Sequence, residues 1–250
     1  MSKTKEKQPF FTATRMAAIA IFAATGGILY SVQIPMPVMF APWLKFNPSD
    51  IPILIGSFAL GAPSGAIIAV LRTLIGLLFK PTTTAFIGET ADILGGGAFA
   101  VPAGLFYAKK KTKGGAGIAC LLGGLCSVAV AVFANRFMLI PWYAKQMGMG
   151  ALAEAMQPLF PACTEKTFYN FYLWLSVAPF NALRCLINSL FTFSVSKNVS
   201  ALLKKADEKF GKKPAKNEDQ TAKNEENAAE NKHNQAEKEE KNGGGNEKQS

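Results

Sequence analysis

Six apolar stretches lie between residues 16 and 197 of this 250-residue chain. An α-helix needs about 20 apolar residues to cross the roughly 30 Å hydrocarbon core of a bilayer. We therefore predict an all-α, polytopic membrane protein with six transmembrane helices, at residues 16–34, 51–61, 64–79, 86–107, 115–142 and 169–197. The second and third stretches are short for a span, so helix tilt, a locally thinner bilayer or a re-entrant pair are the alternatives.

A segment rich in proline and aromatic residues, Pro35–Pro52, joins the first two stretches. Irregular backbone cannot face lipid, because its N–H and C=O groups would find no partner there. The segment must therefore lie at the interface or be buried as a cap, and it is the best candidate for the lid of a small-molecule site. Its aromatic residues Phe40, Trp43 and Phe46 can stack on a planar ligand, although an interfacial aromatic belt is an alternative explanation.

The basic excess of the chain belongs to its apolar part. Residues 1–200 carry 16 Lys/Arg and 6 Asp/Glu, whereas residues 201–250 carry 11 of each. This distribution does not indicate a nucleic-acid partner. Lysine and arginine gather instead before the first helix, at 109–113 and at 197–205, which predicts that both termini lie on the cytoplasmic side of the cell membrane.

We divide the chain into a basic cytoplasmic N-terminus (1–15), a six-helix membrane domain (16–197) and a charged cytoplasmic tail (198–250). The first apolar stretch has 19 residues, longer than the roughly 7–15 of a signal-peptide core, so we predict that it is a retained helix. The tail lacks the apolar content to form a core and is predicted to be disordered. A partner-binding role for the tail is the alternative.

The apolar part of the sequence lacks the histidine that histidine-based catalysis or histidine metal ligation would need. The only histidine of the chain, His233, lies in the tail, and the four cysteines form no Cys-x-x-Cys motif. No phosphate-binding Gly-x-x-x-x-Gly-Lys-Ser/Thr loop is present. We therefore expect neither an enzyme nor an ATPase, and no metal or cofactor.

Polar side chains inside the apolar stretches mark the candidate ligand site, because such groups are costly in hydrocarbon and usually face a cavity or a partner. Asn181, Arg184 and Asn188 follow one face of the last stretch, and Asn135 lies in the fifth. An amide both donates and accepts, so it can match a heterocycle edge with alternating C=O and N–H groups. Hydrogen bonds that only pack helices together are the alternative reading.

Two carboxylates, Glu89 and Asp92, lie three residues apart near the start of the fourth stretch. Pairing with an arginine is the favoured reading. Exposure at the interface, a cation site and acid–base chemistry are the alternatives, and no histidine or further acidic cluster supports the last.

Four alanines, Ala13, Ala17, Ala20 and Ala24, share one face at the first stretch. Small residues at such spacing allow close helix approach in lipid. The face is either packed against the protein's own helices or is a docking surface for another membrane protein.

Three groups of residues carry a family resemblance: Leu44–Pro52 with Leu54–Gly61; Gly88–Asp92 with Val101–Tyr107; and Asn135 with Leu139–Tyr143 and Pro179–Arg184. They resemble the substrate-binding S components of energy-coupling factor (ECF) vitamin transporters, most closely the riboflavin-specific ones. The similarity covers about residues 10–197 and omits the tail.

The resemblance implies a six-helix fold that binds its vitamin near the outer surface, under the first loop. It also implies partners, namely a transmembrane coupling subunit and two ATPases, with Ala20-x-x-x-Ala24 as the docking motif. Asn135 and Asn181 look like the asparagines that hold the polar edge of a flavin. Arg184 stands where a lysine is expected and Asp92 where an asparagine is commoner, so another vitamin or a flavin relative is the alternative ligand.

The predicted substrate site therefore combines residues of the first loop with polar residues of the later helices. It consists of Trp43, Leu44, Lys45, Phe46, Glu89, Asp92, Asn135, Asn181, Arg184 and Asn188. A stand-alone channel or facilitator is a rival function, and an intramembrane enzyme is a third.

Overall fold

The structure is a computed structural model that describes residues 12–36 and 39–210, with side chains described through residue 194. The predictions for the basic segment before residue 12 and for the tail beyond residue 210 lie outside the described residues. The last helix continues to Phe210, past the boundary at residue 197 that we predicted for the membrane domain.

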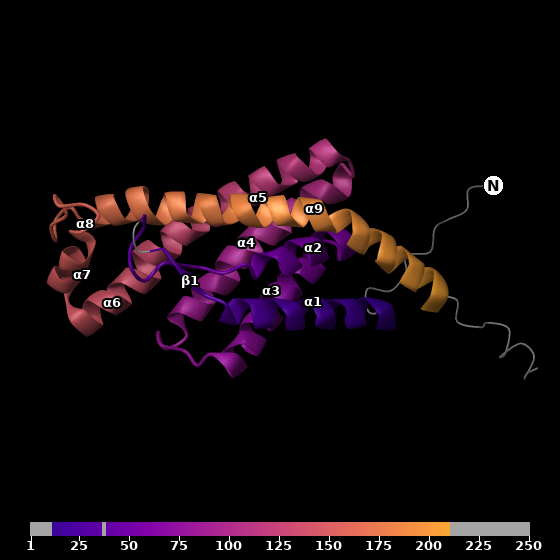
Figure 1. Ribbon diagram of the computed structural model, residues 1–250, viewed down its shortest axis with the longest axis horizontal. Coiled ribbons are helices and arrows are strands. Elements are labelled where there is room, and N and C mark those ends of the chain that lie inside the picture. Colours follow the sequence, from indigo (N-terminus) through magenta and orange to yellow (C-terminus); the bar gives the residue numbers. More distant parts are fainter. Residues whose placement is uncertain (1–11, 37–38, 211–250) are drawn as a thin grey trace, which may run out of the picture. The chain divides into compact units, whose positions relative to one another are not determined.

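Helices occupy all six of the predicted stretches (Figure 1). In the described ranges, four helices are long and apolar enough to cross a membrane: α1 (Ala13–Ser31), α3 (Ala62–Phe79), α4 (Ile87–Lys109) and the continuous helix Lys113–Met147. The last of these joins α5 (Lys113–Ala134), η1 (Asn135–Leu139) and α6 (Ile140–Met147).

The two remaining stretches are helical but fall short of those criteria. Helix α2 (Asp50–Leu60) is apolar but has only 11 residues. The last stretch starts with α8 (Phe168–Asn170) and η2 (Phe171–Val177) and continues as α9 (Ala178–Phe210). Buried polar side chains at Asn181, Arg184 and Asn188 lower its hydropathy. A further helix, α7 (Met149–Met156), lies between α6 and α8.

Local sequence explains several helix boundaries. The Thr12 side chain caps α1 by accepting a hydrogen bond from the Arg15 N–H. Gly61 separates α2 from α3 with φ at 95°, a conformation that residues with a side chain rarely adopt, and Pro63 follows in the first turn of α3. Gly148, with φ at 86°, ends α6 in the same way.

Glycines allow the helices to pack backbone to backbone. Helix α4 packs most extensively against α5, and α1 against α3. A side chain at Gly123 of α5 would clash with the Phe99 carbonyl oxygen of α4. A side chain at Gly104 of α4 would meet Ala62, 3.0 Å from its Cα atom. Such close approach is typical of helix packing in membranes, where dispersion contacts replace the hydrophobic effect.

The two π-helical turns, η1 and η2, interrupt long helices at the same end of the molecule and contact each other. Asn135 is the first residue of η1 and Tyr172 is the second residue of η2, and both side chains are buried. Single π turns inside α-helices are frequently found at functional sites. Here they bring Asn135 and Tyr172 together.

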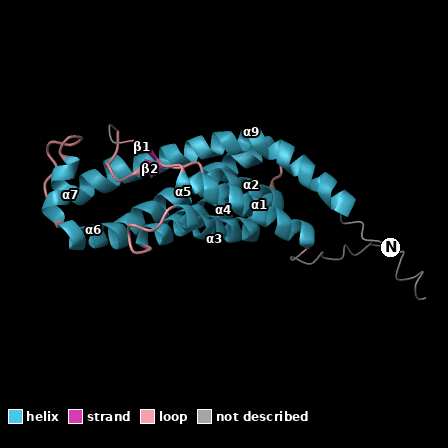
Figure 2. Cartoon of the chain, turned by 60° about the horizontal axis from the view of Figure 1, so that its bottom comes forward, coloured by secondary structure: helices cyan, strands magenta, loops and turns pink. Residues whose placement is uncertain are grey.

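The predicted lid segment folds into a small hairpin between α1 and α2 (Figure 2). Strand β1 (Ile34–Pro35) pairs antiparallel with β2 (Lys45–Phe46), with Ile34 opposite Phe46. The buried rings of Phe40 and Phe46 pack with Phe180 of α9. This apolar contact fixes the hairpin against the helices that carry the predicted polar site.

Candidate functional site

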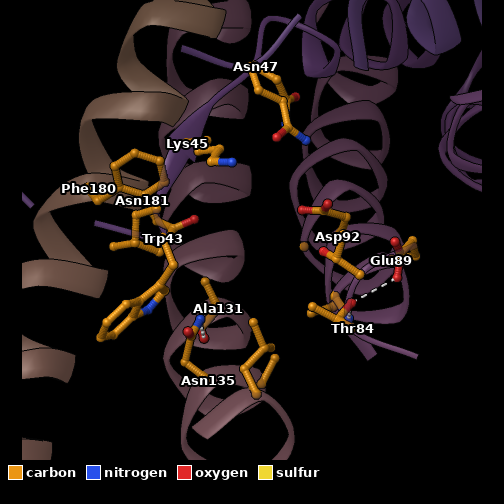
Figure 3. A pocket seen from close by; sticks show the side chains of 18 of the residues that line it. Trp43, Lys45, Asn47, Thr84, Glu89, Asp92, Ala131, Asn135, Phe180 and Asn181 are labelled. Atoms are coloured by element: carbon orange, nitrogen blue, oxygen red, sulfur yellow. Dashed lines mark hydrogen bonds between the residues drawn. The ribbon is translucent and has the colours of Figure 1, made fainter. Parts of the chain in front are cut away.

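A cavity of about 450 Å³ lies between the hairpin segment and helices α4, α5 and α9. This volume falls in the range of about 300–1,000 Å³ that is usual for small-molecule sites. Figure 3 shows the carboxylates of α4 on one side and the amides of Asn135 in η1 and Asn181 in α9 on the other. The lining includes the predicted residues Trp43, Leu44, Lys45, Glu89, Asp92, Asn135, Asn181 and Arg184.

A chain of hydrogen bonds fixes the orientation of Asn135. The Trp43 indole N–H donates to the Tyr172 hydroxyl at 2.9 Å, and that hydroxyl donates to the Asn135 Oδ1 atom at 2.5 Å. The Asn135 Nδ2 atom donates to the Ala131 carbonyl oxygen at 2.8 Å. The amide is therefore held from both ends, and the chain ties the hairpin to η1 and η2.

Asn181 is held at one end only. Its Nδ2 atom donates to the Val177 carbonyl oxygen at 2.8 Å, which leaves the Oδ1 atom directed into the cavity (Figure 3). The Asn181 side chain is only 4% exposed, so this oxygen is an acceptor at the wall of the cavity and not on the outer surface of the protein. It can receive an N–H group of a ligand, while the second amide hydrogen can donate.

The hairpin contributes both polar and apolar groups to the cavity. The Lys45 side chain reaches toward its centre (Figure 3). The Asn47 Oδ1 atom accepts a hydrogen bond from the Ser49 hydroxyl at 2.5 Å, which leaves its amide nitrogen as a donor. The Trp43 ring lies 5.5 Å from the Tyr172 ring, so an aromatic surface borders the amide wall.

The carboxylates of α4 have different partners. Asp92 accepts a hydrogen bond from the Tyr30 hydroxyl at 2.7 Å and lies 3.9 Å from the Arg184 Nη1 atom, so it is paired with an arginine as predicted. The arginine ion pairs that the described residues make involve Asp50 and Asp92 and do not involve Glu89. Glu89 accepts hydrogen bonds from the hydroxyls of Thr82 and Thr84, at 3.0 and 3.1 Å.

The loop after α3 adds a second lysine to the rim of the cavity. Lys80 donates to the Gln33 side-chain oxygen. Burial lowers the pKa of Lys80, and the charge of the neighbouring Lys45 lowers it further, while Glu89 and Asp92 oppose the change. The two lysines are therefore close enough to repel each other, and a ligand that bears an acceptor at the rim would relieve this.

A buried carboxylate that the sequence analysis did not select, Asp50, lies behind the inner wall. Its Oδ2 atom lies 3.4 Å from the Arg184 Nε atom, and its Oδ1 atom lies 3.3 Å from the Arg72 Nη2 atom. The sequence indicates this ion pair only weakly: Asp50 directly precedes the second apolar stretch, and Arg72 interrupts the third. Cavity residues that were also missed include Tyr30, Asn47, Lys80, Thr84 and Phe180.

Two predicted site residues, Phe46 and Asn188, do not line the cavity. Side chains alternate along a strand. Lys45 therefore points toward the cavity while Phe46 is buried against Phe180. Asn188 lies two turns beyond Asn181 and donates to the Asp50 Oδ2 atom at 3.3 Å. Both residues support the wall from behind.

The predicted docking face lies on the outside of α1. The side chains of Ala13, Ala17, Ala20 and Ala24 are all exposed. The opposite side of the helix is buried, at Ala18 and Ala23 among others. The other described residues thus leave this face uncovered, and its docking role stays a prediction.

The arrangement is a cavity of small-molecule size that is bordered by amide groups, by Arg184 and by residues of the hairpin segment. Residues 14–196 match the sequence model of the ECF transporter substrate-specific component. The chain belongs to this family. As a substrate-specific component it is a membrane protein whose role is to bind a transported substrate rather than to catalyse a reaction.

Two curated relatives cover most of the chain. The riboflavin transporter RibU of Lactococcus lactis subsp. cremoris (strain NZ9000) is 30% identical over 195 residues, which is 76% of this chain and 90% of the relative. The riboflavin transporter RibU of Staphylococcus aureus (strain TCH60) is 22% identical over 191 residues, which is 76% of this chain and 93% of the relative.

A solved structure supports the fold. It is described as the S component of a bacterial ECF transporter, and it matches with a TM-score of 0.58 at 21% identity. The match covers 76% of this chain and 97% of the solved chain. The chain therefore has the S-component fold, in agreement with the fold that the sequence predicted.

Proposed function

We propose that this chain binds riboflavin at an extracytoplasmic site and is the substrate-binding subunit of an ATP-driven riboflavin uptake system. The names of the two relatives support this ligand. The observation that carries the proposal is the Asn181 amide, which is tied to the helix backbone through its nitrogen and presents its oxygen to the cavity.

The flavin ring system suits the two kinds of wall. Its pyrimidine edge alternates C=O and N–H groups, which the Asn181 oxygen and the N–H donors of Asn135 and Arg184 can match. Its apolar face can stack on the aromatic and aliphatic side chains of Trp43 and Leu44. Buried amide partners discriminate strongly, because an analogue without the matching group leaves a polar atom unpaired.

The remaining parts of the proposal concern orientation and partners. Both termini would be cytoplasmic, with the hairpin and the cavity facing the outside of the plasma membrane. ATP hydrolysis would take place in two partner ATPases that act through a transmembrane coupling subunit. The exposed alanine face of α1 is the proposed docking surface for that subunit. No cofactor is proposed, since riboflavin is the transported ligand.

The test begins with the chain purified alone in detergent. We expect a yellow sample with a flavin absorption band or, after removal of bound ligand, saturable quenching of riboflavin fluorescence at one molecule per chain. In vesicles, the chain alone should bind riboflavin without accumulating it. Absence of binding at micromolar riboflavin would reject the ligand, and uptake by the chain alone would favour a facilitator.

A further inference from the structure

Asp50 is the centre of a buried ion network behind the inner wall of the cavity. It is the first residue of α2, and both Asp50 and Arg72 are only 1% exposed. Arg72 reaches it from α3 and Arg184 reaches it from α9. Arg72 also donates to the Ser49 hydroxyl and, at 3.2 Å, to the Asp92 carbonyl oxygen. The network therefore joins the end of the hairpin segment to four helices, α2, α3, α4 and α9.

The contacts between the carboxylates and the guanidinium groups of this network are ion pairs more than well-directed hydrogen bonds. The closest nitrogen–oxygen distances are 3.3 Å between Asp50 and Arg72, 3.4 Å between Asp50 and Arg184, and 3.9 Å between Asp92 and Arg184. The Asp50 Oδ1 and Arg184 Nε atoms are buried without a hydrogen bond of normal geometry. Two carboxylates face two guanidinium groups, so the four charges sum to zero.

Only part of the network reaches the cavity. Arg184 and Asp92 line it, whereas Asp50 and Arg72 do not. Arg184 thus lies between the two parts, with its Nε atom 3.4 Å from the Asp50 carboxylate and its Nη1 atom 3.9 Å from the Asp92 carboxylate. Asp50 therefore compensates the charge of Arg184 from behind, at its Nε atom, while Arg184 itself lines the cavity.

We propose that Asp50 and Arg72 act as positioning residues that make the inner wall of the cavity electrically neutral, so that Arg184 receives an uncharged acceptor edge rather than an anion. This deepens the proposed function and rests on it, because the pyrimidine edge of riboflavin is uncharged at neutral pH. Removing the charge of Asp50 should make the wall favour an anionic edge, and removing the charge of Arg72 should make the wall disfavour one. Neither residue touches the ligand.

The experiment follows the ring N–H proton of bound riboflavin, which is lost in alkaline solution with a change in the absorption spectrum. Asp50→Asn leaves an extra positive charge behind the wall and should lower the pH midpoint of that change. Arg72→Gln leaves an extra negative charge and should raise it. A unit charge on the order of 8 Å away, at an effective dielectric of about 20, predicts a shift of about one to two pH units.

The double variant Asp50→Asn/Arg72→Gln restores neutrality and should return the midpoint to within about half a unit of the wild type. Asn170→Ala, at an exposed residue that does not line the cavity, should leave it unchanged. The other titrating groups that face the cavity are Lys45, Lys80, Glu89, Tyr30 and Tyr143. They are common to every variant, so only differences from the wild type are interpreted.

The outcomes separate this inference from the proposed function. A wild type that fails to bind riboflavin overturns both. A wild type that binds, with single variants that shift the midpoint in the same direction or not at all, overturns the charge role alone. If Asp50→Asn does not fold, Arg72→Gln and the double variant suffice: a rise in the first and none in the second supports the inference, and any other pattern overturns it.

Discussion

Substitution of Asn181 by alanine tests the ligand site most directly. The change removes the oxygen that faces the cavity and the hydrogen bond from Nδ2 to the Val177 carbonyl oxygen. Leaving a buried ligand N–H group without its acceptor costs about 1–3 kcal/mol. At about 1.4 kcal/mol per tenfold change, the Kd for riboflavin should rise by about 5- to 150-fold. The fold should be little affected, because alanine favours the helix more than asparagine does.

The assay is a riboflavin fluorescence titration on detergent-purified protein, with thermal unfolding measured in parallel. Asn170→Ala is the matched control, since this asparagine belongs to the same helical stretch but is exposed and does not line the cavity. We expect its Kd to stay within about twofold of the wild type. An Asn181→Ala protein that unfolds like the wild type and binds riboflavin as tightly would refute the placement of the ligand.

Three further predictions address positioning, packing and docking. Tyr172→Phe breaks the hydrogen bond to Asn135 and should raise the Kd for riboflavin by about 5- to 10-fold, for about 1 kcal/mol lost, without changing the number of sites in a titration. Gly123→Ala forces a side chain onto a carbonyl oxygen of α4 and should lower Tm, whereas Gly117→Ala, with open space around the added atom, should leave Tm unchanged or raise it. Ala20→Trp on the exposed face of α1 should leave riboflavin binding intact but abolish co-purification with the coupling subunit, and normal assembly of this variant would refute the docking face.

The helices were predictable because length and apolar content constrain membrane segments strongly. Each of the six stretches is helical, and the predicted ends differ from the observed ends by a few residues at most positions. The first stretch illustrates the remaining error. The sequence predicted a helix to residue 34, but α1 ends at Ser31 because Ile34 pairs with Phe46 in the hairpin. Such pairing depends on a segment that lies several residues further along the chain.

The composition of the site was predictable in part. Polar residues in apolar stretches pointed to Asn135, Asn181 and Arg184, and all three line the cavity. Helical spacing predicted that Asn188 lies on the same helix face as Asn181, but it did not predict that Asn188 lies beyond the cavity. Residues seven apart on a helix lie about 10 Å apart along its axis. Asp50 was missed because its role depends on α3 and α9 packing beside α2, which a single sequence does not show.

The two π-helical turns affect how variation in this chain should be interpreted. Each wider turn holds an additional residue, so side chains after it are rotated by about 100° relative to an uninterrupted helix. A helical wheel drawn across Asn135 or Tyr172 would therefore assign lipid-facing positions to the interior. Deleting one residue from either turn would restore a regular helix but turn the two side chains apart, so insertions and deletions there should change ligand affinity while leaving the membrane-spanning length almost unaltered.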